Sequence, residues 1–375
     1  MRIVIVNCFD TYEQRTDLVY EYFIGKGHDV TVIESDFRHF QKVKRTDHKT
    51  GVTFVEAQPY FKNMSVSRLT SHYKFAKKAF ALVEELQPDL LYVLLPPNSL
   101  AKFAAKYKRA HSDVLLYFDI IDLWPETMPL GKLKSFPPFT SWQRLRDNNL
   151  KAADFVITEC NLYQTVLKGV LKGIKTETIY LARRVAEIDI KPVFDKDKIH
   201  LCYLGSINNI IDIPTIAKLV KAINSRKPVV LHIIGDGESK DTLIDEVKNT
   251  GAKVEYYGEI YDLKEKQQIF DKCQFGINIM KKTVCVGLTM KSIDYFEAGL
   301  PILNTIGEDT TGLINQYGAG LDLAFNSFEE LATRIEKLSE SDFLRMRDNA
   351  RRIFDEQLSV DVFYKKMDMI CEKLS

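Results

Sequence analysis

Short apolar runs alternate with amphipathic stretches along this chain, and this pattern predicts parallel α/β units. The runs are rich in Val, Ile, Leu and Tyr, which is typical of strands buried on both faces of a sheet. Two series of strands are expected. The first comprises residues 3–7, 29–33, 53–57, 90–95, 114–120, 155–159 and 178–182. The second comprises residues 199–206, 229–235, 254–258, 275–280, 301–305 and 320–324.

Two series of strands imply two domains, and a length of 375 residues is sufficient for two hydrophobic cores. Residues 1–183 form the predicted N-terminal Rossmann-like domain, and residues 199–358 form the second. The charged segment 184–198 contains one proline and is interpreted as the linker. The last stretch, 359–375, is amphipathic and predicts a helix.

The composition is that of a soluble globular protein, with 45% hydrophobic and 27% charged residues. The longest apolar runs are far shorter than the ~20 residues of a membrane-spanning helix. The chain opens directly on a predicted strand, so no signal peptide is expected. Six scattered cysteines without a CxxC pair indicate neither a disulfide framework nor a zinc site. The reducing cytosol is therefore the expected location.

Charge is unevenly distributed, since residues 1–184 carry a net +7 and residues 185–375 carry −6. A basic half can bind an anionic membrane leaflet, and the alternative is a solvated surface with incidental bias. Two stretches, 59–80 and 132–146, mix aromatic and basic residues, which suits the headgroup region of a membrane. The alternative for residues 69–86 is an amphipathic helix that covers the protein's own core.

The segment 281–303 joins two predicted strands through a loop and a helix. Thr289 is a suitable helix N-cap, and Gly299 with Pro301 ends the helix. The helix N-terminus then points to the carboxyl end of the preceding strand, where free N–H groups and the helix dipole favour a phosphate. Lys291 in the first turn adds positive charge, and Asp294 one turn deeper can accept hydrogen bonds from sugar hydroxyls.

The spacing of Asp294, Gly299 and Pro301 resembles the nucleotide-sugar motif of the GT-B glycosyltransferases, most of all family 4. The resemblance implies an α/β chain of the GT-B class, with two doubly wound Rossmann-like domains and a cleft between them. It also implies a C-terminal helix that packs on the first domain, a retaining reaction, and a ribose contact by Asp294. A second family Glu, eight residues earlier, is replaced here by Val286.

The resemblance extends to two other parts of the nucleotide site. In the 202–209 segment, Gly205 and Ser206 end a strand and let the backbone approach a ligand, with Asn208 beside them; the alternative is a tight turn. The Arg and Lys that follow this strand in the family are absent, so other groups must neutralise the diphosphate. The candidates are Lys281, Lys282, Lys291 and the backbone of Gly287, Leu288 and Thr289. Glu259 and Ile260 are candidates for backbone contacts to the base, and the alternative is an ordinary βα loop.

The run 118–129, FDIIDLWPETMP, resembles segments of family 4 members that build polysaccharides. Asp119, Asp122 and Glu126 are then expected to face the cleft, where they position the acceptor hydroxyl or stabilise charge on the sugar. The alternative is that Asp122 and Glu126 cap the following structure. Seven dispersed histidines favour no metal site, and the Lys and Arg residues are not organised as a nucleic-acid reader.

The sequence therefore predicts a nucleotide-sugar-dependent glycosyltransferase in bacterial polysaccharide or glycoconjugate assembly, with a lipid-linked or protein-linked glycan acceptor. The donor is a UDP, GDP or dTDP sugar, and no separate cofactor is expected. The expected location is the cytoplasm, with a peripheral position on the inner face of the cell membrane. One alternative is a non-catalytic GT-B subunit that binds a glycan or a partner transferase. Another is a GT-B nucleotide-sugar epimerase.

Overall fold

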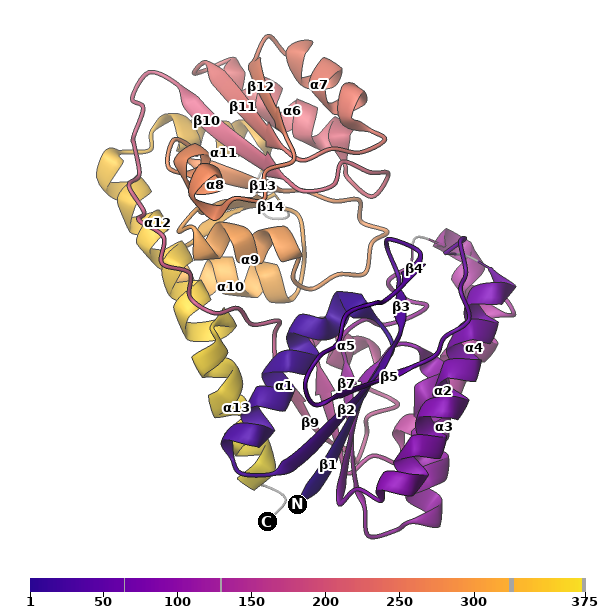
Figure 1. Ribbon diagram of the computed structural model, residues 1–375. Coiled ribbons are helices and arrows are strands. Elements are labelled where there is room, and N and C mark those ends of the chain that lie inside the picture. The colour runs from indigo at the N-terminus through magenta and orange to yellow at the C-terminus, as the bar shows by residue number, and fades with distance from the viewer. Residues whose placement is uncertain (64, 129, 324–326, 373–375) are drawn as a thin grey trace. The chain divides into compact units, whose positions relative to one another are not determined.

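A computed structural model describes the chain except for residues 64, 129, 324–326 and 373–375. The chain divides into two compact units (Figure 1). Unit 1 comprises Met1–Leu181 and Phe363–Ser375, and unit 2 comprises Ala182–Val362. Between residues 184 and 198 the described backbone forms neither a helix nor a strand. Each unit has one large parallel sheet with helices on both sides, so the predicted α/β class is confirmed.

The sheet of unit 1 is parallel, in the order β5-β2-β1-β6-β7-β8-β9. Its strands are β1 (Arg2–Asn7), β2 (Asp29–Ser35), β5 (Val52–Val55), β6 (Leu90–Leu95), β7 (Leu115–Ile120), β8 (Phe155–Thr158) and β9 (Lys175–Thr178). The hairpin β3 (Phe37–Arg38) and β4 (Val43–Lys44) stands apart. The helices are α1 (Glu13–Gly25), α2 (Val66–Leu86), α3 (Asn98–Ala110), α4 (Phe139–Leu150), α5 (Asn161–Val166) and α13 (Val360–Glu372). α1 and α13 lie on one side of the sheet, and α2, α3 and α4 on the other (Figure 1).

Unit 2 repeats this plan with strand order β12-β11-β10-β13-β14-β15, again parallel. Its strands are β10 (Ile199–Leu204), β11 (Val229–Ile234), β12 (Lys253–Gly258), β13 (Phe275–Asn278), β14 (Ile302–Asn304) and β15 (Gly320–Asp322). Its helices are α6 (Ile213–Asn224), α7 (Lys240–Lys248), α8 (Leu263–Phe270), α9 (Met290–Glu297), α10 (Asp309–Tyr317), α11 (Phe328–Glu336) and α12 (Glu340–Ile353). The central strands are buried on both faces, as their continuous apolar sequences predict.

One predicted strand, 178–182, is wrong in its position. The strand found is β9, which ends at Thr178, where 178–182 was expected to begin. β9 pairs with β8 alone among the described strands, and β8 ends at Thr158 opposite Thr178. The chain beyond Thr178 therefore has no backbone ladder to join, although its side chains Ile179 and Tyr180 are buried. Apolar character alone does not distinguish a buried strand from a buried loop.

The C-terminal helix α13 returns to unit 1. The Asp368 carboxylate accepts a hydrogen bond from the Tyr22 hydroxyl (2.8 Å), and Lys366 Nζ donates to the Thr178 carbonyl (2.6 Å). The Arg15 guanidinium lies 4.7 Å from the centre of the Phe363 ring. α13 thus completes the core of unit 1 from the far end of the chain.

Tyr295 fixes helix α9 to the sheet of unit 2. Its hydroxyl donates to the Cys202 carbonyl (3.1 Å) and accepts from the Leu204 amide (2.8 Å), and the side chain is fully buried. The ring lies against Gly276 in β13, where an added Cβ would come within 2.8 Å of three ring atoms. The absence of a side chain at Gly276 therefore sets how closely α9 approaches β10 and β13.

We expect Gly276→Ala to lower the free energy of unfolding by ~1–3 kcal/mol, because Tyr295 is tied at its hydroxyl and cannot withdraw without losing hydrogen bonds. Gly312→Ala is the matched control, since Gly312 lies inside α10 with nothing within 4 Å of an added Cβ. That control is expected to raise stability by up to ~1 kcal/mol. Urea unfolding of both variants measures the two effects. A Gly276→Ala protein as stable as the parent would show that this contact does not constrain α9.

Candidate nucleotide-sugar site

The N-terminus of α9 is anchored to the end of β13. Thr289 accepts a hydrogen bond from the Ser292 amide (3.1 Å), and its hydroxyl donates to Asn278 Oδ1 (2.9 Å) at the last position of the strand. The predicted helix and its N-cap are therefore confirmed. The first turn of α9 is thus held at the carboxyl edge of the sheet, where its free N–H groups and dipole favour an anion.

The loop after β10 approaches its neighbours backbone to backbone. Gly205 has φ +103°, and a Cβ on Gly235 would lie 2.2 Å from the Gly205 carbonyl oxygen. Ser206 follows and is exposed. Asn208 turns inward, because its Oδ1 accepts from the amide of Ile210 (3.1 Å) and closes a local turn. The backbone at Gly205 therefore packs closely on that of Gly235, and the Asn208 side-chain oxygen is already engaged.

Lys291 reaches back from α9 to this loop. Its Cε lies 4.0 Å from where a Cβ on Gly205 would stand, and its Nζ lies 4.2 Å from the centre of the Tyr203 ring. The residue is partly exposed, but Nζ is buried and has no hydrogen-bond partner among the described atoms. Burial lowers the pKa of Lys291 to about 7.

No anion in the described surroundings of Lys291 neutralises it. The titratable groups that face it from β10 are Cys202 and Tyr203, and burial raises the pKa of both, so each is neutral at pH 7. Tyr295, on α9 itself, is likewise neutral because burial raises its pKa. A buried amine without a partner is unfavourable, and a bound anion would remove that cost.

Asp294 lies one turn further along α9 and is already paired. Arg183 holds both carboxylate oxygens, with Nη1 2.9 Å from Oδ1 and Nη2 3.5 Å from Oδ2. Lys266 Nζ lies 3.5 Å from Oδ1, and Glu297 shares Arg183 at 3.6 Å. Neither cation is recognisable from the sequence, since residues 111 and 28 positions away from Asp294 have no local signature.

The remaining candidates in unit 2 are less closely grouped. Gly287 and Leu288 are buried, and the Gly287 carbonyl accepts from the amide and hydroxyl of Thr310 (3.0 and 2.6 Å). Lys281 and Lys282 were expected at the end of the strand, but β13 ends at Asn278 and both residues lie exposed beyond it.

Glu259 and Ile260 follow β12, which lies two strands from β10 in the sheet. Glu259 is exposed and accepts from the Tyr261 hydroxyl (3.1 Å), and Ile260 is half-buried. The structure therefore brings Gly205, Thr289, Lys291 and Asp294 into one region, and places Glu259 and Ile260 further along the same edge.

In unit 1, the expectation that Asp119 is open to a ligand is wrong. Asp119 is fully buried, and both of its carboxylate oxygens accept from Arg15 (2.8 and 3.2 Å). The Tyr92 hydroxyl also donates to it (2.5 Å). This buried, hydrogen-bonded ion pair belongs to the core, because removing either partner would leave an uncompensated charge.

Asp122 and Glu126 hold the turn that follows β7. Asp122 accepts from Trp124 Nε1 (2.5 Å) and from the Thr127 hydroxyl (2.5 Å), and burial raises the pKa of Asp122. Glu126 accepts two hydrogen bonds from Arg146 (2.7 and 2.8 Å), whose side chain is 1% exposed. Glu126 is thus the counter-charge of a buried arginine, whereas Asp122 accepts hydrogen bonds from the neutral side chains of Tyr12, Trp124 and Thr127.

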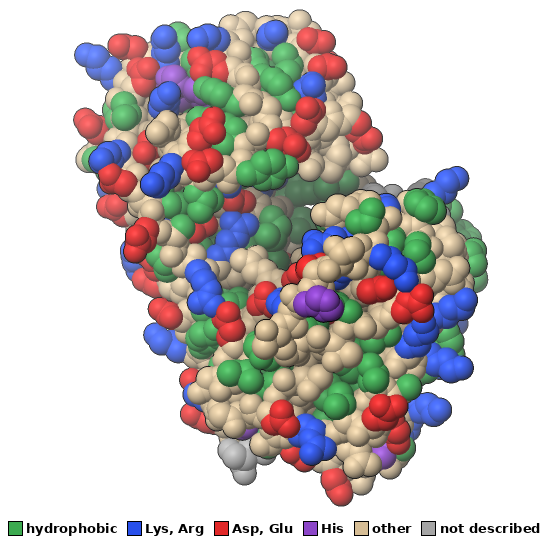
Figure 2. All heavy atoms as spheres, viewed as in Figure 1, with side chains coloured by type: hydrophobic (Ala, Val, Ile, Leu, Met, Phe, Trp, Pro, Cys, Tyr) green, Lys and Arg blue, Asp and Glu red, His purple; other side chains and the backbone are tan. Residues whose placement is uncertain are grey.

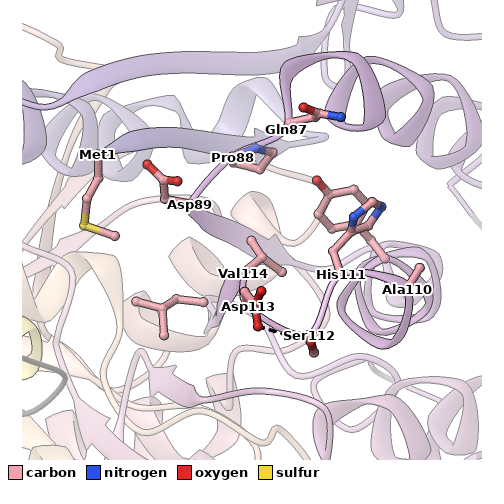
Figure 3. Close-up of a pocket in the computed structure, with 11 residues that line it drawn as sticks. Met1, Gln87, Pro88, Asp89, Ala110, His111, Ser112, Asp113 and Val114 are labelled. Atoms are coloured by element: carbon pink, nitrogen blue, oxygen red, sulfur yellow. Dashed lines mark hydrogen bonds between the residues drawn. The ribbon is translucent and has the colours of Figure 1, made fainter.

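A polar hollow of about 630 Å³ lies at the opposite edge of the unit 1 sheet. Met1, Asp89, His111 and Asp113 are among its lining residues (Figure 3), at the amino ends of β1, β6 and β7. Parallel α/β sheets bind ligands at the carboxyl ends of their strands, so this hollow is not the candidate site. No three His, Cys, Asp or Glu side chains within the described residues come together as a metal site.

Residues 185–354 match the model of the family described as "Glycosyl transferases group 1". No curated protein matches the chain. Among solved structures, sucrose-phosphate synthase from Thermosynechococcus elongatus is similar, with a TM-score of 0.72 and 14% identity over 100% of this chain and 99% of that one. HepE from Anabaena in complex with UDP has a TM-score of 0.70 and 15% identity over 100% of both chains.

WaaG, a glycosyltransferase involved in lipopolysaccharide biosynthesis, has a TM-score of 0.63 and 13% identity over 99% of both chains. These likenesses establish the GT-B fold, with two doubly wound units, that the strand pattern and the 294–301 motif predicted. Residues 185–354 thus match a glycosyltransferase family, and the whole chain has the GT-B fold.

Proposed function

We propose that this protein transfers a sugar from a nucleotide-sugar donor to a lipid-linked glycan in bacterial polysaccharide or glycoconjugate assembly, with retention of configuration. The observation that carries the proposal is the unpartnered Lys291 amine beside Gly205, at the dipole-positive end of α9. HepE, a structural relative, is solved with UDP and with UDP-glucose, which supports a nucleotide sugar as donor. The proposed donor is a UDP sugar.

Lys291 and the first turn of α9 have the right chemistry to bind the donor diphosphate. Negative charge on the leaving diphosphate grows in the transition state, so a preorganised cation and helix dipole lower the barrier more than they strengthen ground-state binding. Lys291 and the helix dipole would supply the positive charge for the diphosphate. In the family this charge comes from an Arg and a Lys after the strand that corresponds to β10, and this chain lacks both. Asp294, oriented by Arg183 and Lys266, accepts hydrogen bonds from the ribose hydroxyls.

The acceptor is assigned to the carboxyl edge of the unit 1 sheet. Asp122 lies there, directly after β7, and its raised pKa is compatible with a carboxyl group that exchanges a proton with the acceptor hydroxyl. Glu126 is less suited to that role, because Arg146 occupies both of its oxygens. The acceptor-side role is therefore assigned to Asp122.

Unit 1 is also the proposed membrane-facing part. Phe61, Phe136 and Leu133 are 78, 60 and 58% exposed, and Lys and Arg side chains gather along the edge formed by α2, α3 and α4 (Figure 2). Phe139 and Trp142 are half-buried, so these two aromatic rings are not enclosed in the core of unit 1. The inner face of α2 packs on the unit's own core, as the alternative interpretation of 69–86 holds. None of the described helices is long and apolar enough to span a bilayer.

Loss of the ribose contact is tested by Asp294→Asn. We expect nucleotide affinity to fall by ~1–3 kcal/mol, the cost of losing a charged hydrogen-bond partner, while the fold persists. UDP titration by calorimetry measures the change. Glu297→Gln is the matched control. Glu297 also forms an ion pair with Arg183, but it is the last residue of α9 and so lies further from the N-terminus of the helix than Asp294. Unchanged UDP affinity in Asp294→Asn would refute the ribose assignment.

Transfer itself is tested by hydrolysis of UDP, GDP and dTDP sugars in the absence of acceptor. We expect slow release of one nucleotide by the parent protein and a large loss of turnover in Lys291→Ala. Lys282→Ala, which removes an exposed lysine of the same loop, is expected to retain activity. Nucleotide binding without any hydrolysis or transfer would favour the non-catalytic GT-B subunit instead.

Nucleotide binding should depend on pH through Lys291, whose pKa is about 7 in the free protein. A bound diphosphate raises that pKa, so binding takes up a proton above pH 7. Affinity for UDP is therefore expected to fall between pH 7.5 and 9, by up to about tenfold per pH unit. Calorimetry in two buffers of different ionisation enthalpy measures the proton uptake. Lys291→Met should bind more weakly and show a flat profile, and a flat profile in the parent would exclude this mechanism.

Membrane association is tested by co-sedimentation with vesicles. We expect binding to anionic vesicles that weakens sharply with salt, because charge attraction at a surface is screened within about 10 Å at 0.1 M. Phe61→Ser combined with Phe136→Ser should weaken it further, whereas Leu344→Ser in unit 2, at a residue 40% exposed, should not. Equally poor sedimentation with anionic and neutral vesicles would count against a membrane role.

A further inference from the structure

An apolar pocket of about 210 Å³ opens in unit 1 between the N-terminal ends of α2 and α4. Its walls are mainly hydrocarbon, from Val66 and Leu69 on α2 and from Phe139 and Trp142 on α4. Phe139 and Trp142 are half-buried and Leu69 is 40% exposed, so the pocket is open to solvent. A small number of polar groups at such a pocket determines which ligand it accepts.

The polar group that matters here is Arg68, whose side chain lines the pocket and is only 6% exposed. Its Nη1 donates to the Asn63 carbonyl (2.8 Å), but its Nε is buried with no partner. The guanidinium lies over the Trp124 ring, 4.4 Å from its centre. No Asp or Glu of the described chain forms an ion pair with Arg68, which contrasts with the paired arginines Arg15 and Arg146.

An arginine cannot lose its proton, so burial without a counter-ion leaves a positive charge uncompensated. Stacking on Trp124 offsets part of this cost. A bound anion would neutralise the rest, and guanidinium groups favour phosphate because they match its geometry. The apolar walls beside it suit a hydrocarbon chain. Inorganic phosphate would leave those walls unused, and a neutral hydrocarbon would leave Arg68 unpaired.

The pocket is next to the residues assigned to the acceptor. Trp124, beneath Arg68, donates through Nε1 to Asp122 (2.5 Å). Phe9, two residues after the end of β1, also lies near Arg68, with its ring centre 5.7 Å from the guanidinium carbon. Exposed Phe61 and Phe136 each lie two positions in sequence from a residue that lines the pocket, Asn63 and Pro138. A phosphate at Arg68 and a sugar attached to it would therefore both lie along the carboxyl edge of this sheet.

We propose that this pocket binds a lipid phosphate: the phosphate lies against Arg68, and the first carbons of the chain lie between α2 and α4. The pocket holds only the start of a long chain, so the remainder stays in the bilayer. The assignment of this lipid as the anchor of the acceptor rests on the proposed function. The binding site itself does not, since it lies wholly within unit 1.

The probe is decyl phosphate below its micelle concentration, followed by intrinsic tryptophan fluorescence. The chain has two tryptophans, Trp124 and Trp142, and both border the site, so a saturable change is expected on binding. Decanol and inorganic phosphate are each expected to bind at least tenfold more weakly. Equal binding of decanol would reduce the site to a nonspecific apolar patch, and equal binding of phosphate would make it a simple anion site; either result overturns the proposal.

Leu69→Glu places a carboxylate at the edge of the pocket and should weaken decyl phosphate binding more than tenfold. Tyr73→Glu is the matched control, since Tyr73 is one turn along α2, is 43% exposed and does not line the pocket. Arg68→Gln should also weaken binding more than tenfold. Unchanged circular dichroism and urea unfolding of both glutamate variants would confirm that unit 1 is folded, and UDP binding by unit 2 should also be unchanged. The proposal would be overturned if decyl phosphate binding were unchanged in Leu69→Glu, or if it fell equally in Tyr73→Glu. Absence of UDP binding in the parent protein would contradict only the proposed function.

Discussion

Parallel strand pairing is the constraint on which the rest of this structure depends. Within each large sheet all strands are parallel, so the carboxyl ends of neighbouring strands meet at one edge of that sheet. Gly205 after β10, the Thr289 cap held by the end of β13, and Asp122 after β7 all lie at such edges for this reason. Residues that are distant in sequence therefore become neighbours without any dedicated contact to bring them together.

The buried cations discussed above fall into two groups, those paired with carboxylates and those without such a partner among the described residues. Arg15 and Arg347 are buried beside carboxylates, Asp119 and Asp271, and the pairs are parts of the core. Lys291 and Arg68 are placed where no described carboxylate reaches them. Because an unpaired buried cation is unfavourable, such a position is expected where an external anion completes the site. Among the residues that the structure describes, Arg68 is such a cation in unit 1 and Lys291 in unit 2, each near the carboxyl edge of its sheet.

Local features were predictable from the sequence, and long-range ones were not. The cap at Thr289 and the helix it starts depend on residues within three positions, so the pattern sufficed. The strand expected at 178–182 failed because its end is set by β8, another strand. Arg183 is the last residue of the predicted N-terminal domain, and its sequence position gives no sign of the ion pair that it forms with Asp294. Arg68 belonged to a stretch expected to face a membrane, and its burial under aromatic rings has no signature in spacing.

Arg183 has a second consequence through its backbone. Its amide donates to the Leu358 carbonyl (2.9 Å), and its carbonyl accepts from the Val360 amide (3.1 Å). The chain enters unit 2 at Ala182 and leaves it at Val362, so these bonds tie the incoming and outgoing chains side by side. The segments through which the chain enters and leaves unit 2 are thus paired at Arg183 and Ser359. The side chain of Arg183 also forms the ion pair with Asp294. A ligand that competes with Arg183 for Asp294 would therefore act on the segment through which the chain enters unit 2.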